Sequence, residues 1–139
     1  MLSRAAFGGS AIDFIHHWRS QYVQRMVMDK AHRFGIRVSR VNTRGTSAYA
    51  FDGSGKVVRG KDAGFKTNAM CKFQNGKNYN CDLSASYNIG ARYFIREILK
   101  SVSVTERLRI EAKGPQCSKR STSTYATLIS LCAELHAAV

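Results

Sequence analysis

The chain has 139 residues, 44% of them hydrophobic and 10% aromatic, which fits one folded domain and excludes wholesale disorder. Lys and Arg number 22 against 9 Asp and Glu, and the formal net charge of +13 favours a polyanionic partner over a neutral metabolite. No window is apolar enough to span a bilayer, so the sequence predicts a soluble protein with no membrane partner.

The first expected element is an amphipathic helix over residues 11–34, because apolar residues recur there at spacings of three and four. These residues are Ile12, Ile15, Trp18, Tyr22, Val23, Met26, Val27, Ala31 and Phe34. Ser10 with Asp13 forms a helix start signal, and Gly35 suits a left-handed helix end. The β-branched run I-R-V-S-R-V over residues 36–41 then predicts a strand.

Residues 43–80 are rich in Gly, Asn, Ser, Thr and Lys, which predicts a small β-hairpin insertion with tight turns at D-G-S-G (52–55) and Q-N-G-K (74–77). A largely apolar second helix is expected over residues 83–102. Ser103 and Glu106 form a capping box for a short helix that Gly114 and Pro115 end. The whole is a mixed α/β fold of the α+β type.

A Ser/Thr-rich link over residues 118–124 leads to a last expected helix over residues 125–136. Its predicted apolar face must pack on this domain or on a partner chain. That face comprises Tyr125, Leu128, Ile129, Cys132 and Leu135.

Metal-binding and catalytic signals are weak. Paired C-x-x-C motifs are absent, and Cys71 and Cys81, which could face each other across the Q-N-G-K turn, supply only two thiolates. We therefore expect no zinc and no other resident metal. The four irregularly spaced cysteines and the lack of an apolar signal core predict reduced thiols in the cytoplasm. Asp82, at the start of the second helix, has two interpretations: a helix cap, which its position favours, or a magnesium ligand.

Basic side chains alternate with aromatic ones, namely Tyr49, Phe51, Phe65, Phe73 and Tyr79, through the strand and the insertion. Such a mixture suits phosphate backbones and unstacked bases. The basic residues are Arg37, Arg40, Arg44, Lys56, Arg59, Lys61, Lys66, Lys72 and Lys77. Arg92, Arg96 and Lys100 are spaced to form a basic stripe on the second helix. We expect a nucleic-acid interface; the alternative is a generally basic, solvated surface.

Two motifs carry a family resemblance. K-A-H-R-F-G-I-R-V-S-R-V-N-T-R-G-T-S (30–47) and N-C-D-L-S-A-S-Y-N-I-G-A-R (80–92) resemble the C-terminal part of transposon-encoded TnpB (OrfB) proteins, RNA-guided nucleases related to compact type V CRISPR effectors. The resemblance covers about residues 10–100. It implies a partial RuvC, RNase H-like domain at 10–42 and 81–102, a zinc-ribbon-like insertion at 43–80, and a helical extension at 103–139.

The chain also departs from the family pattern at its metal-binding and catalytic positions. Ala50 and Gly53 stand where the ribbon has its first two cysteines, and Lys72 and Asn75 stand at the second pair, so the resemblance implies a ribbon without zinc. Asp82 matches the third acidic residue of the RuvC site, whereas the two acids that precede it in the family have no counterpart. Two-metal hydrolysis needs several carboxylates, so we expect no nuclease activity from this chain alone.

The leading expectation is a DNA-binding C-terminal fragment of a TnpB-like, transposase-associated protein in a prokaryotic-type cytoplasm, associated with the nucleoid. DNA is the expected partner, with guide RNA as a further one. One alternative is a C-terminal subunit that completes a split, magnesium-dependent, RNA-guided DNA endonuclease with a separate N-terminal half. Another is a small basic interaction protein.

Overall fold

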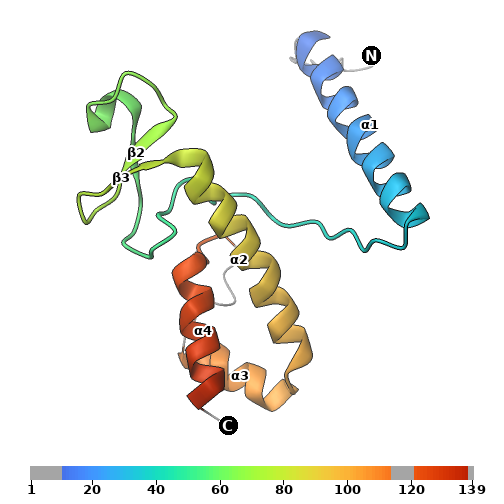
Figure 1. The fold of residues 1–139 in the computed structure, drawn as a ribbon, viewed down its shortest axis with the longest axis vertical. Helices are drawn as coiled ribbons and strands as arrows, with labels where there is room; N and C mark the ends of the chain where they lie inside the picture. Colours follow the sequence, from blue (N-terminus) through green and yellow to red (C-terminus); the bar gives the residue numbers. More distant parts are fainter. Residues whose placement is uncertain (1–10, 114–120, 138–139) are drawn as a thin grey trace, which may run out of the picture. The chain divides into compact units, whose positions relative to one another are not determined.

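A computed structural model describes the backbone of residues 11–113 and 121–137, and the side chains of these ranges from residue 19 onward (Figure 1). The chain divides into two units, Met1–Arg40 and Val41–Val139. In the described ranges the chain has a mixed α+β structure with four α-helices and one three-stranded antiparallel sheet. None of these helices combines the length and the hydropathy needed to cross a membrane.

The first unit contains helix α1, Ala11–Arg33, close to the bounds that the apolar spacing predicts. The backbone N–H of Gly35 donates to the carbonyl of His32 (3.0 Å) and that of Ile36 to the carbonyl of Ala31 (2.9 Å). Gly35 has a φ of 66°, so the predicted left-handed helix end is confirmed. The expected cap residue, Ser10, lies outside the described residues.

The strand predicted over residues 36–41 is wrong, because residues 36–42 have no regular secondary structure. Ile36 and Val38 are exposed, and the Arg40 guanidinium donates to the sulfur of Met28 (3.4 Å). A β-branched run becomes a strand when a neighbouring strand accepts its backbone hydrogen bonds. None of the described strands pairs with this segment, so it stays irregular.

The second unit begins with the predicted hairpin insertion. Strands β1 (Val58–Arg59), β2 (Met70–Lys72) and β3 (Asn78–Asn80) pair in that order, with a 3₁₀ turn, η1 (Gly60–Ala63), between β1 and β2. An isolated bridge from Tyr49 to Lys56 flanks the D-G-S-G turn.

Both predicted turns are confirmed by their hydrogen bonds. At D-G-S-G, the backbone N–H of Ala50 donates to the carbonyl of Gly55 (2.9 Å). At Q-N-G-K, that of Phe73 donates to the carbonyl of Lys77 (2.8 Å). Gly76 has a φ of 85°, which a residue with a side chain rarely adopts.

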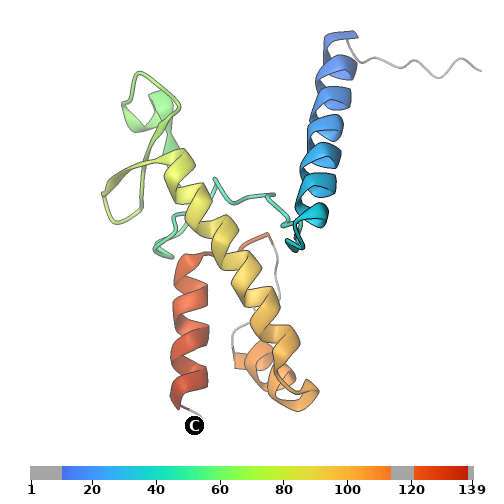
Figure 2. The same ribbon diagram turned by 45° about the vertical axis from the view of Figure 1, so that its right-hand side comes forward.

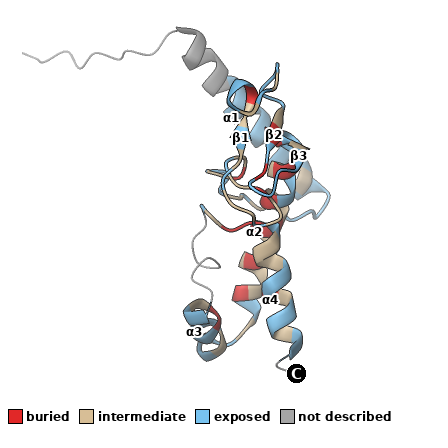
Figure 3. Cartoon of the chain, turned by 90° about the vertical axis from the view of Figure 1, so that its left-hand side faces the viewer, coloured by how far each residue is buried: buried red, intermediate tan, exposed pale blue. Residues whose placement is uncertain are grey.

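Three helices complete the second unit: α2 (Cys81–Ser101), α3 (Val104–Lys113) and α4 (Tyr125–Ala137). The Ser103 hydroxyl accepts from the backbone N–H of Glu106 (3.2 Å), as the capping box predicts. Helix α4 runs beside α2 (Figures 1 and 2), and buried residues occur along α2 and in the small sheet (Figure 3). The expected terminators Gly114 and Pro115 lie outside the described residues.

The apolar core between the helices consists of Ile95, Leu99, Ile110 and Leu131. Leu131, which is 1% exposed, is the central residue of the α4 face, whereas Ile129 is 51% exposed. The predicted apolar face of the last helix is therefore confirmed for Leu128 and Leu135 but wrong for Ile129, and it omits Leu131. Leu128, Leu131 and Leu135 form the packed face because a spacing of three and four keeps them on one side of the helix.

A second, smaller core lies under the hairpin insertion. Ala50, Cys71, Phe73 and Cys81 are buried there, with Phe51, Val57 and Tyr79 packed against them. The backbone N–H of Cys81 donates to the carbonyl of Ala69 (2.8 Å), which ties the start of α2 to the sheet. Neither cysteine is in a disulfide. Apolar and aromatic packing therefore holds the insertion together.

This core makes stability depend on pH in the alkaline range. Burial, with the neighbouring thiol of Cys81, raises the pKa of Cys71 from 9.0 to about 11. The folded state therefore prefers the protonated thiol of Cys71. The stability that this preference contributes is lost as the pH rises from about 9 towards 11. We expect the free energy of unfolding to fall over that interval more steeply in the wild type than in Cys71→Ala. Parallel curves for the two proteins in urea denaturation would contradict it.

Candidate nucleic-acid interface

The hairpin insertion carries most of the predicted basic interface. Alternation along the strands puts Lys72 on the outward face of the sheet, with Val58 and Asn78 as its cross-strand partners. The other lysines of the insertion are exposed as well, and so is the Arg44 side chain. These lysines are Lys56, Lys61, Lys66 and Lys77.

The insertion has two acidic residues, Asp52 and Asp62, and neither forms an ion pair with its lysines in the described structure. Asp52 accepts hydrogen bonds from the backbone N–H of Ser54 (3.0 Å) and from the amide of Asn75 (2.9 Å). Burial raises the pKa of Asp52, but these hydrogen bonds and the charge of Lys77 outweigh it and lower the pKa below its ordinary value. The ion pairs of α2 and α3 do not involve the lysines of the insertion.

Arg59 differs from the exposed lysines. Its strand position puts it on the same face of the sheet as Cys71 and Tyr79, the face that packs on the small core. Its guanidinium donates to the backbone carbonyl of Ser47. This hydrogen bond links β1 to the loop that precedes the first hairpin. Arg37 and Arg40 are exposed, but they belong to the first unit.

Arg92 is not part of an exposed stripe, so that prediction is wrong for this residue. It is 7% exposed, and its guanidinium donates to the carbonyls of Asn42 (2.8 Å), Arg44 (2.8 Å), Ser121 (3.0 Å) and Ser123 (3.1 Å). Burial lowers the pKa of Arg92, yet a guanidinium in a protein keeps its charge. Backbone carbonyl dipoles, rather than a carboxylate, solvate this buried cation.

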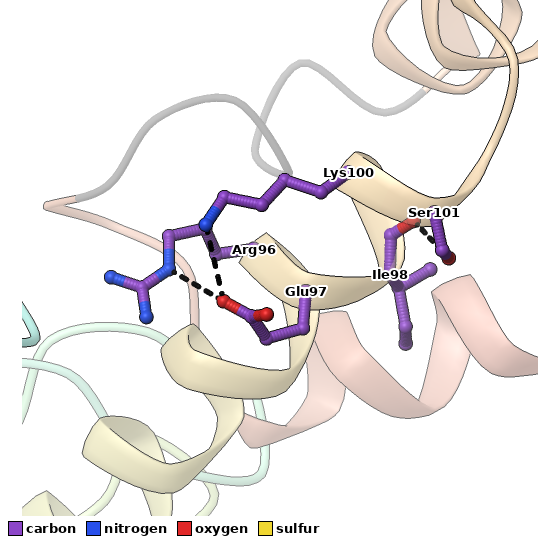
Figure 4. Close-up of polar contacts among 5 residues, drawn as sticks. All are labelled: Arg96, Glu97, Ile98, Lys100 and Ser101. Carbon is purple, nitrogen blue, oxygen red and sulfur yellow. Dashed lines mark hydrogen bonds and ion pairs between the residues drawn. The ribbon is translucent and has the colours of Figure 1, made fainter. Parts of the chain in front are cut away.

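The rest of the expected stripe is partly neutralised. Arg96 and Lys100 converge on the carboxylate of Glu97, each at 3.3 Å (Figure 4). The Arg96 guanidinium also lies 5.7 Å from the ring centroid of Tyr93. These contacts direct both cations toward their own helix and weaken their attraction for a phosphate.

Asn88, one turn before Arg92, is a structural residue that the sequence reasoning missed. Its side-chain amide donates to the carbonyls of Thr46 (2.8 Å) and Tyr49 (2.9 Å), and its oxygen accepts from the backbone N–H of Tyr125 (3.0 Å). Asn88 and Arg92 together hold the loop entering the insertion and the segment before α4 against α2. The sequence did carry a signal of this role: Asn88 and Arg92 are two polar residues at positions i and i+4 of a helix expected to be apolar.

Asp82 is exposed in the first turn of α2, and it is not the helix cap. The capping residue is Asn80, whose side-chain oxygen accepts from the backbone N–H groups of Asp82 (2.9 Å) and Leu83 (3.0 Å). A carboxylate in the first turn still interacts favourably with the helix dipole. The described residues contain no cluster of three or more His, Cys, Asp or Glu that could hold a metal ion.

The capping geometry predicts unequal effects of two neighbouring substitutions. Asn80→Ala removes the cap and should cost about 1 kcal/mol of stability. Asp82→Asn removes only a favourable charge and should cost less than about 0.5 kcal/mol. Urea denaturation of the two variants measures both values, and a larger loss for Asp82→Asn would contradict the assignment of Asn80 as the cap.

In comparisons with known proteins, no family model matches the chain, and searches of curated proteins and of solved structures found no match.

Proposed function

We propose that the chain binds nucleic acid, with DNA as its main partner, through the exposed lysines of the hairpin insertion. In this proposal it is the C-terminal part of a TnpB-like protein that acts in a prokaryotic-type cytoplasm at the nucleoid. Guide RNA is a further partner of the same chemistry.

One observation supports the proposal most. Lys56, Lys61, Lys66 and Lys72 are exposed in the hairpin insertion, and in the described structure neither of its two carboxylates, those of Asp52 and Asp62, forms an ion pair with them. Cations that no carboxylate engages can release the counterions of a phosphate backbone, which is the main source of non-specific affinity for DNA. This arrangement favours a polyanion over a neutral partner.

The proposal assigns no nuclease activity to the isolated chain. Asp82 is the single acidic residue that the resemblance places in a RuvC site, and two-metal hydrolysis needs several carboxylates around its ions. Magnesium belongs to the proposal only if a separate N-terminal half supplies the other acids. The order of a helix, a hairpin insertion and a helix that begins at Cys81 supports the proposed resemblance, whereas the strand expected between the first helix and the insertion is absent from the described residues.

The proposal is tested by fluorescence anisotropy with a labelled DNA duplex and the full chain at low salt. We expect saturable binding that added salt reverses. A neutral protein of similar size is the control. Binding no stronger than that of the control would refute the proposed function.

A further inference from the structure

Four aromatic side chains from four segments of the second unit meet in one continuous cluster. Phe51 comes from the first hairpin, Tyr79 from β3, Tyr87 from α2 and Tyr125 from α4. The ring centroid of Phe51 lies 5.0 Å from that of Tyr79 and 5.1 Å from that of Tyr87. Tyr125 lies 5.7 Å from Tyr87 and 6.4 Å from Phe51. These four rings are called the aromatic platform below.

Burial decreases across the cluster from its inner to its outer rings. Phe73 is buried beneath it, with its centroid 5.8 Å from Phe51 and 5.6 Å from Tyr79. Tyr87 is 41% exposed and Tyr125 is 37% exposed. The inner rings complete the small core, and the outer two leave part of their surface in water, where a ligand can contact it.

A cation accompanies the rings. The ammonium nitrogen of Lys77 lies 5.5 Å from the ring centroid of Phe51 and 5.2 Å from that of Tyr79. It is exposed at the Q-N-G-K turn, so it can contact an anion while its stem covers the rings. Aromatic faces beside a positive charge are the combination that proteins use to bind single-stranded nucleic acid.

We propose that the aromatic platform stacks unpaired bases of a nucleic-acid strand, with Lys77 contacting its phosphates. This inference rests on the proposed function, because the lysines of the insertion supply the sequence-independent attraction. It adds a preference for single strands, since the bases of a duplex are already stacked on one another and their faces are not accessible to Tyr87 and Tyr125.

The test compares two probes of equal charge, a ten-nucleotide oligothymidylate and an abasic strand with the same number of phosphates. Both are titrated against the full chain and against Tyr87→Leu/Tyr125→Leu, which keeps apolar bulk but removes the ring faces. Tyr87→Phe/Tyr125→Phe keeps the faces. Phe94→Leu is the matched control, because Phe94 is an exposed aromatic residue on the same helix whose ring contacts Tyr93 rather than the platform.

The platform predicts that the wild type binds oligothymidylate about tenfold tighter than the abasic strand, from stacking of a single base. The double leucine variant should lose that difference and keep its affinity for the abasic strand, while the phenylalanine variant and Phe94→Leu keep both. Equal affinity of the wild type for the two probes, with binding that salt reverses, would overturn the platform and leave the proposed function intact. Equal losses on both probes in the leucine variant would also overturn it, and no binding of either probe would refute both proposals.

Discussion

Arg92→Met is expected to lower the free energy of unfolding of the second unit by about 2–3 kcal/mol. The substitution removes the donor from the buried carbonyl of Ser123 and from three part-buried acceptors, the carbonyls of Asn42, Arg44 and Ser121. A buried acceptor without a partner costs about 1–3 kcal/mol, and a small domain has only about 5–15 kcal/mol in total. Chemical denaturation followed by the near-ultraviolet circular dichroism of the tyrosines measures the change.

Two matched variants separate this role from a general effect of charge. Arg92→Lys keeps the positive charge but cannot present the planar fork of donors, so we expect an intermediate loss. Arg96→Met removes an arginine one turn later on α2 whose partner, Glu97, is at the surface, and should cost about 1 kcal/mol or less. Equal stabilities of Arg92→Met and Arg96→Met would contradict a structural role for Arg92.

Replacing Lys56, Lys61, Lys66 and Lys72 by glutamine in one variant should weaken DNA binding about a hundredfold at 50 mM salt. Each lysine that contacts a phosphate contributes one released counterion, so the loss falls on affinity rather than on folding. All four side chains are exposed, and we expect the variant to unfold within about 0.5 kcal/mol of the wild type. Fluorescence anisotropy and denaturation on the same samples measure both quantities.

The control variant for this experiment changes cations that already have partners. Lys100, Arg107 and Arg109 form ion pairs on α2 and α3 with Glu97, Glu111 and Glu106. Their replacement by glutamine removes nearly the same charge, yet it should weaken binding far less, since these cations are engaged within the protein. A loss as large as that of the insertion variant would favour the alternative of a generally basic surface.

Local signals in the sequence predicted the elements that depend on local chemistry. Gly35 at a helix end, the turn at Gly76 and the cap at Ser103 each follow from backbone requirements that neighbouring residues satisfy. The strand over residues 36–41 was predicted from its β-branched residues alone, but a strand also needs a pairing partner, which local sequence does not reveal.

The misplaced candidate residues have a shared cause. Arg92 has the spacing of a surface stripe, and only the approach of two distant loops to α2 reveals that it is buried. Asp82 looked like a helix cap, and the boundary had to be known to one residue to recognise Asn80 instead. The exposure of the lysines in the insertion was predictable, because charged side chains in a turn-rich segment are rarely buried.

The dependence of DNA affinity on salt concentration measures how many phosphates the lysines of the insertion contact. With the full chain and a labelled duplex, the logarithm of the association constant should fall linearly with the logarithm of salt, by about 0.9 for every phosphate contact. We expect a wild-type slope steeper than about −3 and a markedly shallower slope for the variant that lacks Lys56, Lys61, Lys66 and Lys72. A flat dependence, or the same slope for both proteins, would contradict this expectation.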